Sequence, residues 1–260
     1  MNTPESRVGS SPDPRGVSVK HRPRGRGAPT PHSACRLASA GCCGYDSLVR
    51  IIAGMHRGRK LAAPEGMATR PMTDRVRENL FNILAGRIEG AVVLDLFCGS
   101  GAIGLEALSR GAHLCHFVDT GPDAIRTVEI NAAHLCLGGK VRITKGDALA
   151  PGDWLAAPED KSYTLVFADP PYKLTADRPG RKRLAEMAAR LVRLGLVADG
   201  ATAMLRTQRG TAMDESWPGF ELTDERTYGT TTLWLMDYKR VTAKQNTVEG
   251  NRKSKIKNQK

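Results

Sequence analysis

Between residues 91 and 238, short apolar runs alternate with segments in which apolar residues recur at helical spacing. The run AVVLDLF (91–97) is typical of a strand buried on both faces, and AIGLEALSRG (102–111) is typical of a helix that ends at a glycine. The same patterns predict helices at 122–136 and 181–196. They predict further strands at 113–119, 140–144, 163–171, 201–207, 220–228 and 231–238.

Strands separated by helices of this length predict a parallel sheet that is covered by helices on both faces. The last two predicted strands have no helical pattern between them, so we expect them to form an antiparallel hairpin. The sequence is therefore assigned to the α/β class. Residues 91–238 are treated as one domain, and no internal repeat is visible in it.

The two ends of the chain have a different composition. Residues 1–47 are rich in proline and glycine and hold 7 Lys/Arg against 3 Asp/Glu, and residues 239–260 hold 8 against 1. Such segments cannot bury enough apolar surface to offset chain entropy, so we expect both to be disordered. Most of the net charge of +12 lies in these two segments. The charge can hold the protein on nucleic acid, or it can belong to ends that are only solvated. Since ordered patterning begins near residue 48, translation from a start near Val49 is an alternative.

Residues 48–90 are expected to form a small module in front of the sheet. The stretch RIIAGMHRGRKL (50–61) has the pattern of a short strand, a glycine turn and a second strand. Thr73 or Asp74 can cap a following helix. The apolar residues of that helix share one face: Val76, Leu80, Ile83 and Leu84.

The stretch LDLFCGSGAIGLEALSRG (94–111) contains G-x-G-x-x-G behind an apolar run, the fingerprint of a dinucleotide-binding turn. NAD would place its pyrophosphate at the start of the following helix, where the carboxylate of Asp95 would face an anion unfavourably. S-adenosylmethionine has no phosphate and carries a positive sulfonium and an α-amino group. Asp95 therefore favours S-adenosylmethionine.

Acidic residues stand at the ends of the predicted strands, where open parallel sheets bind ligands. Asp95 suits the amino-acid end of S-adenosylmethionine, Asp119 can accept both ribose hydroxyls, and Asp147 can accept from the adenine amine. One cofactor thus accounts for three strand-end acids. The predicted cofactor-binding residues are Asp95, Phe97, Gly99, Gly101, Asp119, Asp147, Ala148 and Asp169.

The sequence Asp169-Pro170-Pro171-Tyr172 stands at the end of another strand. Two prolines fix a rigid, extended turn, which aims the Asp169 carboxylate and the Pro170 carbonyl at one point. Both oxygens can accept hydrogen bonds from an exocyclic NH₂ group and orient its lone pair toward a methyl donor. Tyr172 can stack on the base that carries this amine. We therefore predict these four residues as the catalytic group.

These motifs resemble the class I S-adenosylmethionine-dependent methyltransferases that act on exocyclic amines of bases. More narrowly, four stretches resemble the RsmD family, which methylates N2 of a guanine in bacterial 16S ribosomal RNA. They are VRIIAGMHRGRKL, TRPMTDRVRENLFNIL, LDLFCGSGAIGLEALSRGA and FADPPY, and the likeness runs from about Val49 to Tyr238.

The resemblance implies a Rossmann-like, seven-stranded, mostly parallel sheet with the last strand antiparallel. It also implies a guanine-966-type target in 16S rRNA of the small ribosomal subunit or its assembly intermediate, action in the cytoplasm, and contact of the 48–90 module with cofactor and RNA. The segment AMLRTQRG (203–210) lacks the acidic residues that the family leads us to expect after the fifth strand. The predicted RNA-contacting residues are Arg50, Arg57, Arg59, Lys60, Arg70, Arg75 and Arg77.

Other functions remain open at this point. Methylation of adenine N6 in DNA or RNA uses the same amine chemistry, and a non-catalytic RNA-binding assembly factor could retain this fold. Six cysteines show no C-x-x-C pair and no zinc spacing, and no apolar run approaches membrane-spanning length. We therefore expect no metal and no membrane partner, and a monomeric protein.

Overall fold

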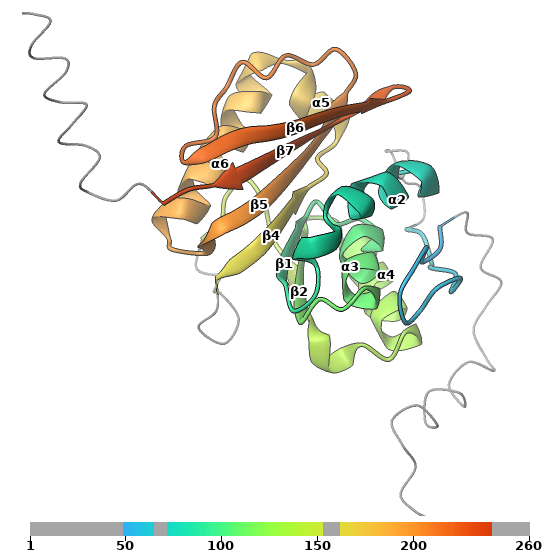
Figure 1. Ribbon diagram of the computed structural model, residues 1–260. Coiled ribbons are helices and arrows are strands. Elements are labelled where there is room, and N and C mark those ends of the chain that lie inside the picture. Colours follow the sequence, from blue (N-terminus) through green and yellow to red (C-terminus); the bar gives the residue numbers. More distant parts are fainter. Residues whose placement is uncertain (1–48, 65–71, 153–161, 241–260) are drawn as a thin grey trace, which may run out of the picture.

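The computed structural model describes residues 49–64, 72–152 and 162–240. Its centre is a seven-stranded sheet with the strand order β3-β2-β1-β4-β5-β7-β6 (Figure 1). The expected disordered segment 1–47 lies outside the described residues, as does all but the first part of 239–260. The strands are β1 (Val92–Leu96), β2 (Leu114–Asp119), β3 (Val141–Lys145), β4 (Tyr163–Ala168), β5 (Val197–Gln208), β6 (Phe220–Tyr228) and β7 (Thr231–Tyr238).

Strands β1 to β5 pair in parallel, whereas β7 lies between β5 and β6 and is antiparallel to both. This confirms the predicted α/β sheet with an antiparallel last strand. The chain builds outward from β1 through β2 to β3 and then returns to place β4 on the other side of β1. The strand order therefore reverses between β1 and β4, which is where open α/β sheets bind ligands.

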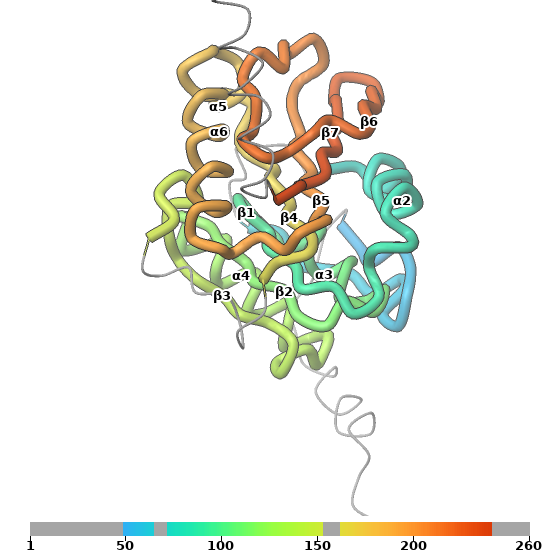
Figure 2. Tube along the Cα trace, turned by 60° about the vertical axis from the view of Figure 1, so that its left-hand side comes forward, coloured from blue at the N-terminus to red at the C-terminus, as the bar shows by residue number. Residues whose placement is uncertain are grey.

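Helices cover both faces of the sheet, and Figure 2 shows α2 and α6 on opposite sides of it. Alternate residues of β1 feed two separate cores, because successive side chains of a strand point to opposite faces. Val93 packs with α2, α3 and α4, and Leu94 packs with α6. The helices are α2 (Asp74–Ile83), α3 (Ala102–Ser109), α4 (Pro122–His134), α5 (Tyr172–Ala176) and α6 (Arg178–Arg193), with short 3₁₀ turns η2 (Ala85–Arg87) and η3 (Gly138–Lys140).

The segment before α2 is bonded to α3 and α4 through buried polar side chains. Glu106 of α3 accepts hydrogen bonds from the N–H groups of Ile52 and Ala53, at 2.7 and 3.0 Å. Asn131 of α4 accepts from the N–H of Ala62 at 2.7 Å and donates to its carbonyl at 3.1 Å. The N-terminal segment therefore forms one core with the sheet domain.

Two local predictions differ in detail from the structure. The 50–61 hairpin is a tight turn held by one antiparallel bridge, between Arg50 and Lys60, rather than by two full strands. Helix α6 begins earlier than the predicted 181–196, because the Asp177 side chain caps it by accepting from the N–H of Gly180 at 2.9 Å. It ends before Gly195, whose φ of +69° favours glycine.

Candidate active site

The candidate site lies at the edge of the sheet where β1 to β4 end. In the parallel register, Leu96 at the end of β1 lies beside Val118 of β2 and Ala168 of β4. Asp169 follows β4 directly, and its N–H donates to the Leu96 carbonyl at 3.3 Å. The fold therefore places the glycine turn after β1 next to the start of Asp169–Tyr172.

The glycine turn is fixed to the end of β2. The N–H of Gly99 donates to Asp119 Oδ2 at 3.0 Å, and the N–H of Gly121 donates to Oδ1 at 2.9 Å. Gly101, with φ +76°, is the N-cap of α3. Phe97 has φ +58°, a conformation that non-glycine residues rarely adopt and that is found most often at functional sites.

Asp95 of β1 is buried beside the first turn of α3 and holds one unpaired oxygen. Its Oδ2 accepts from the N–H of Gly104 at 2.9 Å, whereas Oδ1 has no hydrogen-bond partner among the described residues. Burial raises the pKa of this carboxyl well above its usual range, and the nearby carboxylates of Asp169 and Asp119 act in the same direction. A cationic ligand beside Asp95 would relieve both the missing bond and the unfavourable charge.

A cavity of about 360 Å³ opens next to this turn; we call it the Asp119 cavity. Its volume is in the range of small-molecule sites. Four predicted cofactor residues line it directly, namely Phe97, Asp119, Asp147 and Ala148. Asp147 is exposed, and its Oδ1 accepts from the N–H of Leu149 at 2.9 Å. The remaining lining residues are Thr120, Gly146, Pro171, Lys173 and Leu174.

Asp169 makes a close ion pair with Arg206 of β5. Their Oδ1 and Nε atoms are 2.7 Å apart, and the two side chains are only 15% and 5% exposed. Burial raises the pKa of the Asp169 carboxyl to about 6, while the positive charge of Arg206 acts against that rise. The carboxylate is therefore the main form at neutral pH.

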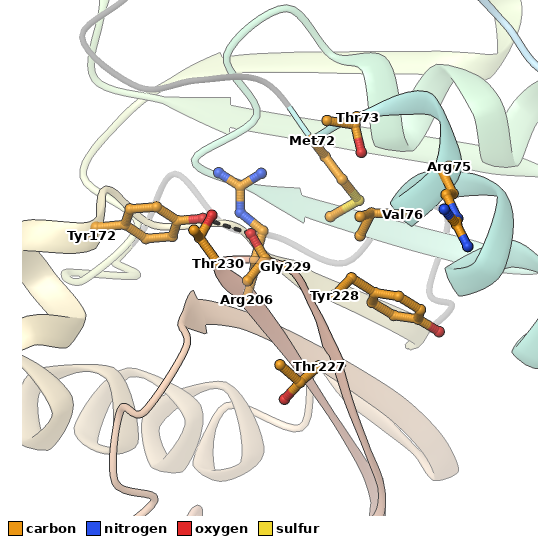
Figure 3. Close-up of a pocket in the computed structure, with 11 residues that line it drawn as sticks. Met72, Thr73, Arg75, Val76, Tyr172, Arg206, Thr227, Tyr228, Gly229 and Thr230 are labelled. Atoms are coloured by element: carbon orange, nitrogen blue, oxygen red, sulfur yellow. Dashed lines mark hydrogen bonds between the residues drawn. The ribbon is translucent and has the colours of Figure 1, made fainter.

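A second cavity, of about 600 Å³, lies on the other side of Asp169–Tyr172; we call it the Arg206 cavity (Figure 3). Pro171 lines the Asp119 cavity, whereas its neighbour Tyr172 lines the Arg206 cavity. The proline turn therefore stands between the two. The other residues around the second cavity are Met72, Thr73, Arg75, Val76, Arg206, Thr227, Tyr228, Gly229, Thr230 and Thr231.

The ring of Tyr172 is held at two points. Its hydroxyl shares a hydrogen bond with Thr231 Oγ1 at 2.8 Å, and the Arg206 guanidinium carbon lies 5.3 Å from the ring centre. Arg206 thus covers one face of the ring by a cation–π contact. A base can stack on Tyr172 only at its other face.

The predicted RNA-contacting residues occupy different environments. Arg57, Lys60 and Arg75 are exposed, and Arg75 also lines the Arg206 cavity. Arg50 is exposed and pairs with Asp74 at 2.9 Å. Arg59 is half-buried and donates to the His134 carbonyl at 2.9 Å. Arg70 lies outside the described residues.

Arg77 requires a correction. We predicted it as an RNA contact, but its side chain is fully buried. Its Nη2 donates to Asp74 Oδ1 at 2.9 Å and to the Arg50 carbonyl at 2.5 Å. Arg77 therefore has no surface for RNA in this structure and instead joins α2 to the segment before it.

Arg206 is the principal site residue that the sequence interpretation missed. The sequence interpretation of 203–210 considered only the missing acidic residues. The informative feature of this segment is an arginine inside a buried strand. Charged side chains are almost never fully buried unless they are paired. That rule alone could have indicated a buried carboxylate partner, although not that the partner was Asp169.

The architecture defines the class first. The sheet with one antiparallel strand, the glycine turn after β1 and Asp169–Tyr172 after β4 are the arrangement of Rossmann-like methyltransferases. The structure matches that of yhhF from Escherichia coli, a methyltransferase candidate by name, with a TM-score of 0.61 and 33% identity over 74% of this chain and 98% of that one. A methylase candidate, HI0767 of Haemophilus influenzae, matches with a TM-score of 0.57 and 28% identity over 74% and 99% of the two chains.

The particular family follows from the sequence match. The chain belongs to the RsmD family, whose model, described as conserved hypothetical protein 95, matches residues 49–237. YlbH of Bacillus subtilis strain 168, named as a candidate rRNA methyltransferase, is 33% identical over 70% of this chain and 95% of its own length. Ribosomal RNA small subunit methyltransferase D of Escherichia coli K12 is 42% identical, but that match covers 48% of this chain and 61% of the relative.

Proposed function

We propose that this protein transfers a methyl group from S-adenosylmethionine to the exocyclic N2 amine of a guanine in 16S rRNA, the guanine-966-type site of the small ribosomal subunit. The observation that carries the proposal is the position of the proline turn after Asp169, since Pro171 lines the Asp119 cavity and Tyr172 lines the Arg206 cavity. The names of the relatives from Bacillus subtilis and Escherichia coli support rRNA as the substrate class.

The residues around the Asp119 cavity fit S-adenosylmethionine. The unpaired Oδ1 of buried Asp95 suits a cationic amino-acid group, and Asp119, already oriented by two backbone N–H groups, keeps lone pairs for ribose hydroxyls. Asp147 and the N–H of Ala148 are placed to recognise a purine edge. When bound, the cofactor supplies the methyl group on its sulfonium. A pyrophosphate, by contrast, would be repelled by the carboxylates of Asp95, Asp119 and Asp147.

Asp169 is suited to orient an amine rather than to remove a proton from it. Its carboxylate accepts a hydrogen bond from the exocyclic NH₂ together with the Pro170 carbonyl, so that the nitrogen lone pair is directed toward the Asp119 cavity. A carboxylate whose acid form has a pKa of about 6 is too weak a base to remove a proton from a neutral exocyclic amine. The contribution of this chain is therefore positioning. The nitrogen becomes positively charged when it takes the methyl group, and it then releases one N–H proton to water.

The Arg206 cavity is the candidate pocket for the target guanine. Bases in a paired helix hide their amines, so the target is expected in a loop or flipped out of a helix. The free face of Tyr172 can stack on it, and stacking of this kind is worth roughly 1–3 kcal/mol per base. Arg50, Arg57, Lys60 and Arg75 are exposed and can contact the RNA backbone. With rRNA of the small subunit as substrate, we expect the enzyme to act in the cytoplasm.

The decisive experiment is methyl transfer with isotope-labelled S-adenosylmethionine and three separate acceptors: naked 16S rRNA, small subunits and DNA. The RNA comes from cells that lack the modification, and the products are digested and separated as nucleosides. We expect N2-methylguanosine from an rRNA acceptor and transfer about 10²–10³-fold slower by Asp169→Asn. N6-methyladenosine would overturn the guanine assignment, and no transfer to any acceptor would favour a binding or assembly factor.

A further inference from the structure

Arg206 occupies an unusual place in the site, because one side chain touches both ends of Asp169–Tyr172. Its Nε lies 2.7 Å from Asp169 Oδ1, and its guanidinium covers the Tyr172 ring at 5.3 Å. Arg206 comes from β5, a strand that contributes none of the predicted cofactor or catalytic residues. Nothing in the local motifs requires an arginine at this position.

The charges around Asp169 explain why a cation is needed there. Arg206 of β5 lies on one side of Asp169, and the buried carboxyl of Asp95 lies on the side of β1. Tyr172 of α5 contributes a neutral ring and no charge. A buried carboxyl beside another carboxyl takes up a proton readily, and a protonated Asp169 would lose its carboxylate acceptor for the amine.

The geometry leaves the other carboxylate oxygen for the substrate. Oδ1 is fully enclosed beside Arg206, so the exposed 15% of the Asp169 side chain belongs to its other atoms. Arg206 thus holds one oxygen while the second remains open to an amine. The same guanidinium lies over the Tyr172 ring, and the Thr231 hydroxyl bonds the hydroxyl at the far end of that ring at 2.8 Å.

We infer that Arg206 is the positioning residue of this active site: it keeps Asp169 ionised and correctly turned, and it fixes Tyr172 as the stacking surface. The inference rests on the proposed function for its activity measurements, but it also has a test that needs no substrate. Arg206 is not required to touch the guanine. It acts through the two residues that do.

The test without substrate is the titration of Asp169 in the full chain, followed by carboxyl ¹³C NMR and assigned by its loss in Asp169→Asn. The wild-type midpoint is expected at about 6. Arg206→Gln should raise it by about 1–3 pH units, the usual effect of a neighbouring opposite charge. Arg206→Lys should hold it near the wild-type value. An unchanged midpoint in Arg206→Gln would overturn the inference.

The activity test uses the same variants. Arg206→Gln should lower kcat roughly 10–100-fold at pH 7 and move the acidic limb of the kcat profile upward, with KM for S-adenosylmethionine unchanged. Arg206→Lys should return the acidic limb of the kcat profile to its wild-type position. It should not restore the full kcat, because an ammonium lacks the planar guanidinium that stacks on Tyr172. Arg209→Gln, an exposed arginine on the same segment, is the matched control and should behave as wild type.

A double variant keeps the inference testable if Arg206→Gln folds poorly. Asp169→Asn/Arg206→Gln removes both members of the buried pair and should fold better than Arg206→Gln, which leaves a buried charge unpaired. If Arg206 acts through Asp169, the double variant should turn over within about threefold of Asp169→Asn. Fully additive losses would show that Arg206 does not act through Asp169, and a faster Arg206→Gln enzyme would show that Arg206 blocks the pocket; either result would overturn the inference. A wild-type enzyme inactive on every acceptor would instead refute the proposed function and leave the NMR result standing.

Discussion

The two cavities beside Asp169–Tyr172 differ in both charge and construction. The Asp119 cavity carries two carboxylates and one lysine, and most of its wall is chain that directly follows a strand. The Arg206 cavity carries two arginines and, among its described lining residues, no acid. Its wall comes from four segments far apart in the sequence, including the start of α2 and the turn between β6 and β7 (Figure 3).

An acidic cavity favours a cationic small molecule, and a basic one favours a polyanion. The difference therefore supports the proposed pair of ligands of opposite charge. In that proposal the rigid turn between the cavities brings one atom from each ligand together. A substitution in one cavity should therefore weaken the binding of one ligand and leave the binding of the other unchanged.

The largest effect is expected at the turn itself. Asp169→Ala should lower turnover by about 10²–10³-fold, the loss typical of removing one positioning group, while both ligands still bind. Single-turnover transfer and separate binding measurements distinguish these quantities. Asp123→Asn, an exposed acid in the first turn of α4, is the control. Retained turnover in Asp169→Ala would remove Asp169 from the catalytic group.

A smaller effect, confined to one cavity, is expected from Asp119→Asn. Hydrogen bonds to a charged group are worth about 1.5–3 kcal/mol, so affinity for S-adenosylmethionine should fall roughly 10–100-fold. Calorimetry with the cofactor and filter binding with 16S rRNA measure the two ligands separately. We expect rRNA affinity to stay within twofold of wild type. An equal loss for both ligands would contradict the separation of the cavities.

The glycine fingerprint itself can be tested through stability. A Cβ on Gly104 would lie 2.4 Å from Phe117 Cε1 and 2.5 Å from Cys115 Sγ, so α3 could no longer pack closely on β2. Gly104→Ala should cost about 1–3 kcal/mol of unfolding free energy, the usual effect of overpacking. Gly86→Ala, where a Cβ has nothing within 4 Å, is the control for thermal or urea unfolding. A neutral Gly104→Ala would mean that this glycine serves the ligand instead.

Much of the fold was predictable because its signals are local. The central strands β1 and β4 are mostly apolar runs, and the short turn between β6 and β7 indicates the antiparallel pair. The acids after β1 to β3 were likewise identifiable from sequence, since a parallel sheet brings all its strand ends to one edge.

The Arg206 cavity was not predictable in the same way. Nothing local to Tyr228 or Met72 indicates that they face Tyr172, because their proximity depends on β7 inserting between β5 and β6 and on α2 packing against the sheet. The prediction for Arg77 was wrong for a related reason. Its basic character suggested a surface role, and only tertiary contacts with Asp74 and the Arg50 carbonyl show that it is buried.

The smallest effect is expected at the rim of the Arg206 cavity. Arg75 is exposed and makes no ion pair among the described residues, so Arg75→Gln should leave stability and cofactor affinity unchanged. Removing one phosphate contact should weaken rRNA binding a few-fold and reduce the slope of log K against log salt by about 1. Arg193→Gln, at the exposed end of α6 on the opposite face of the sheet, removes the same charge as a control. Equal slopes for the two variants would mean that rRNA responds to total charge alone, whereas a loss restricted to Arg75→Gln would place the RNA backbone beside this cavity.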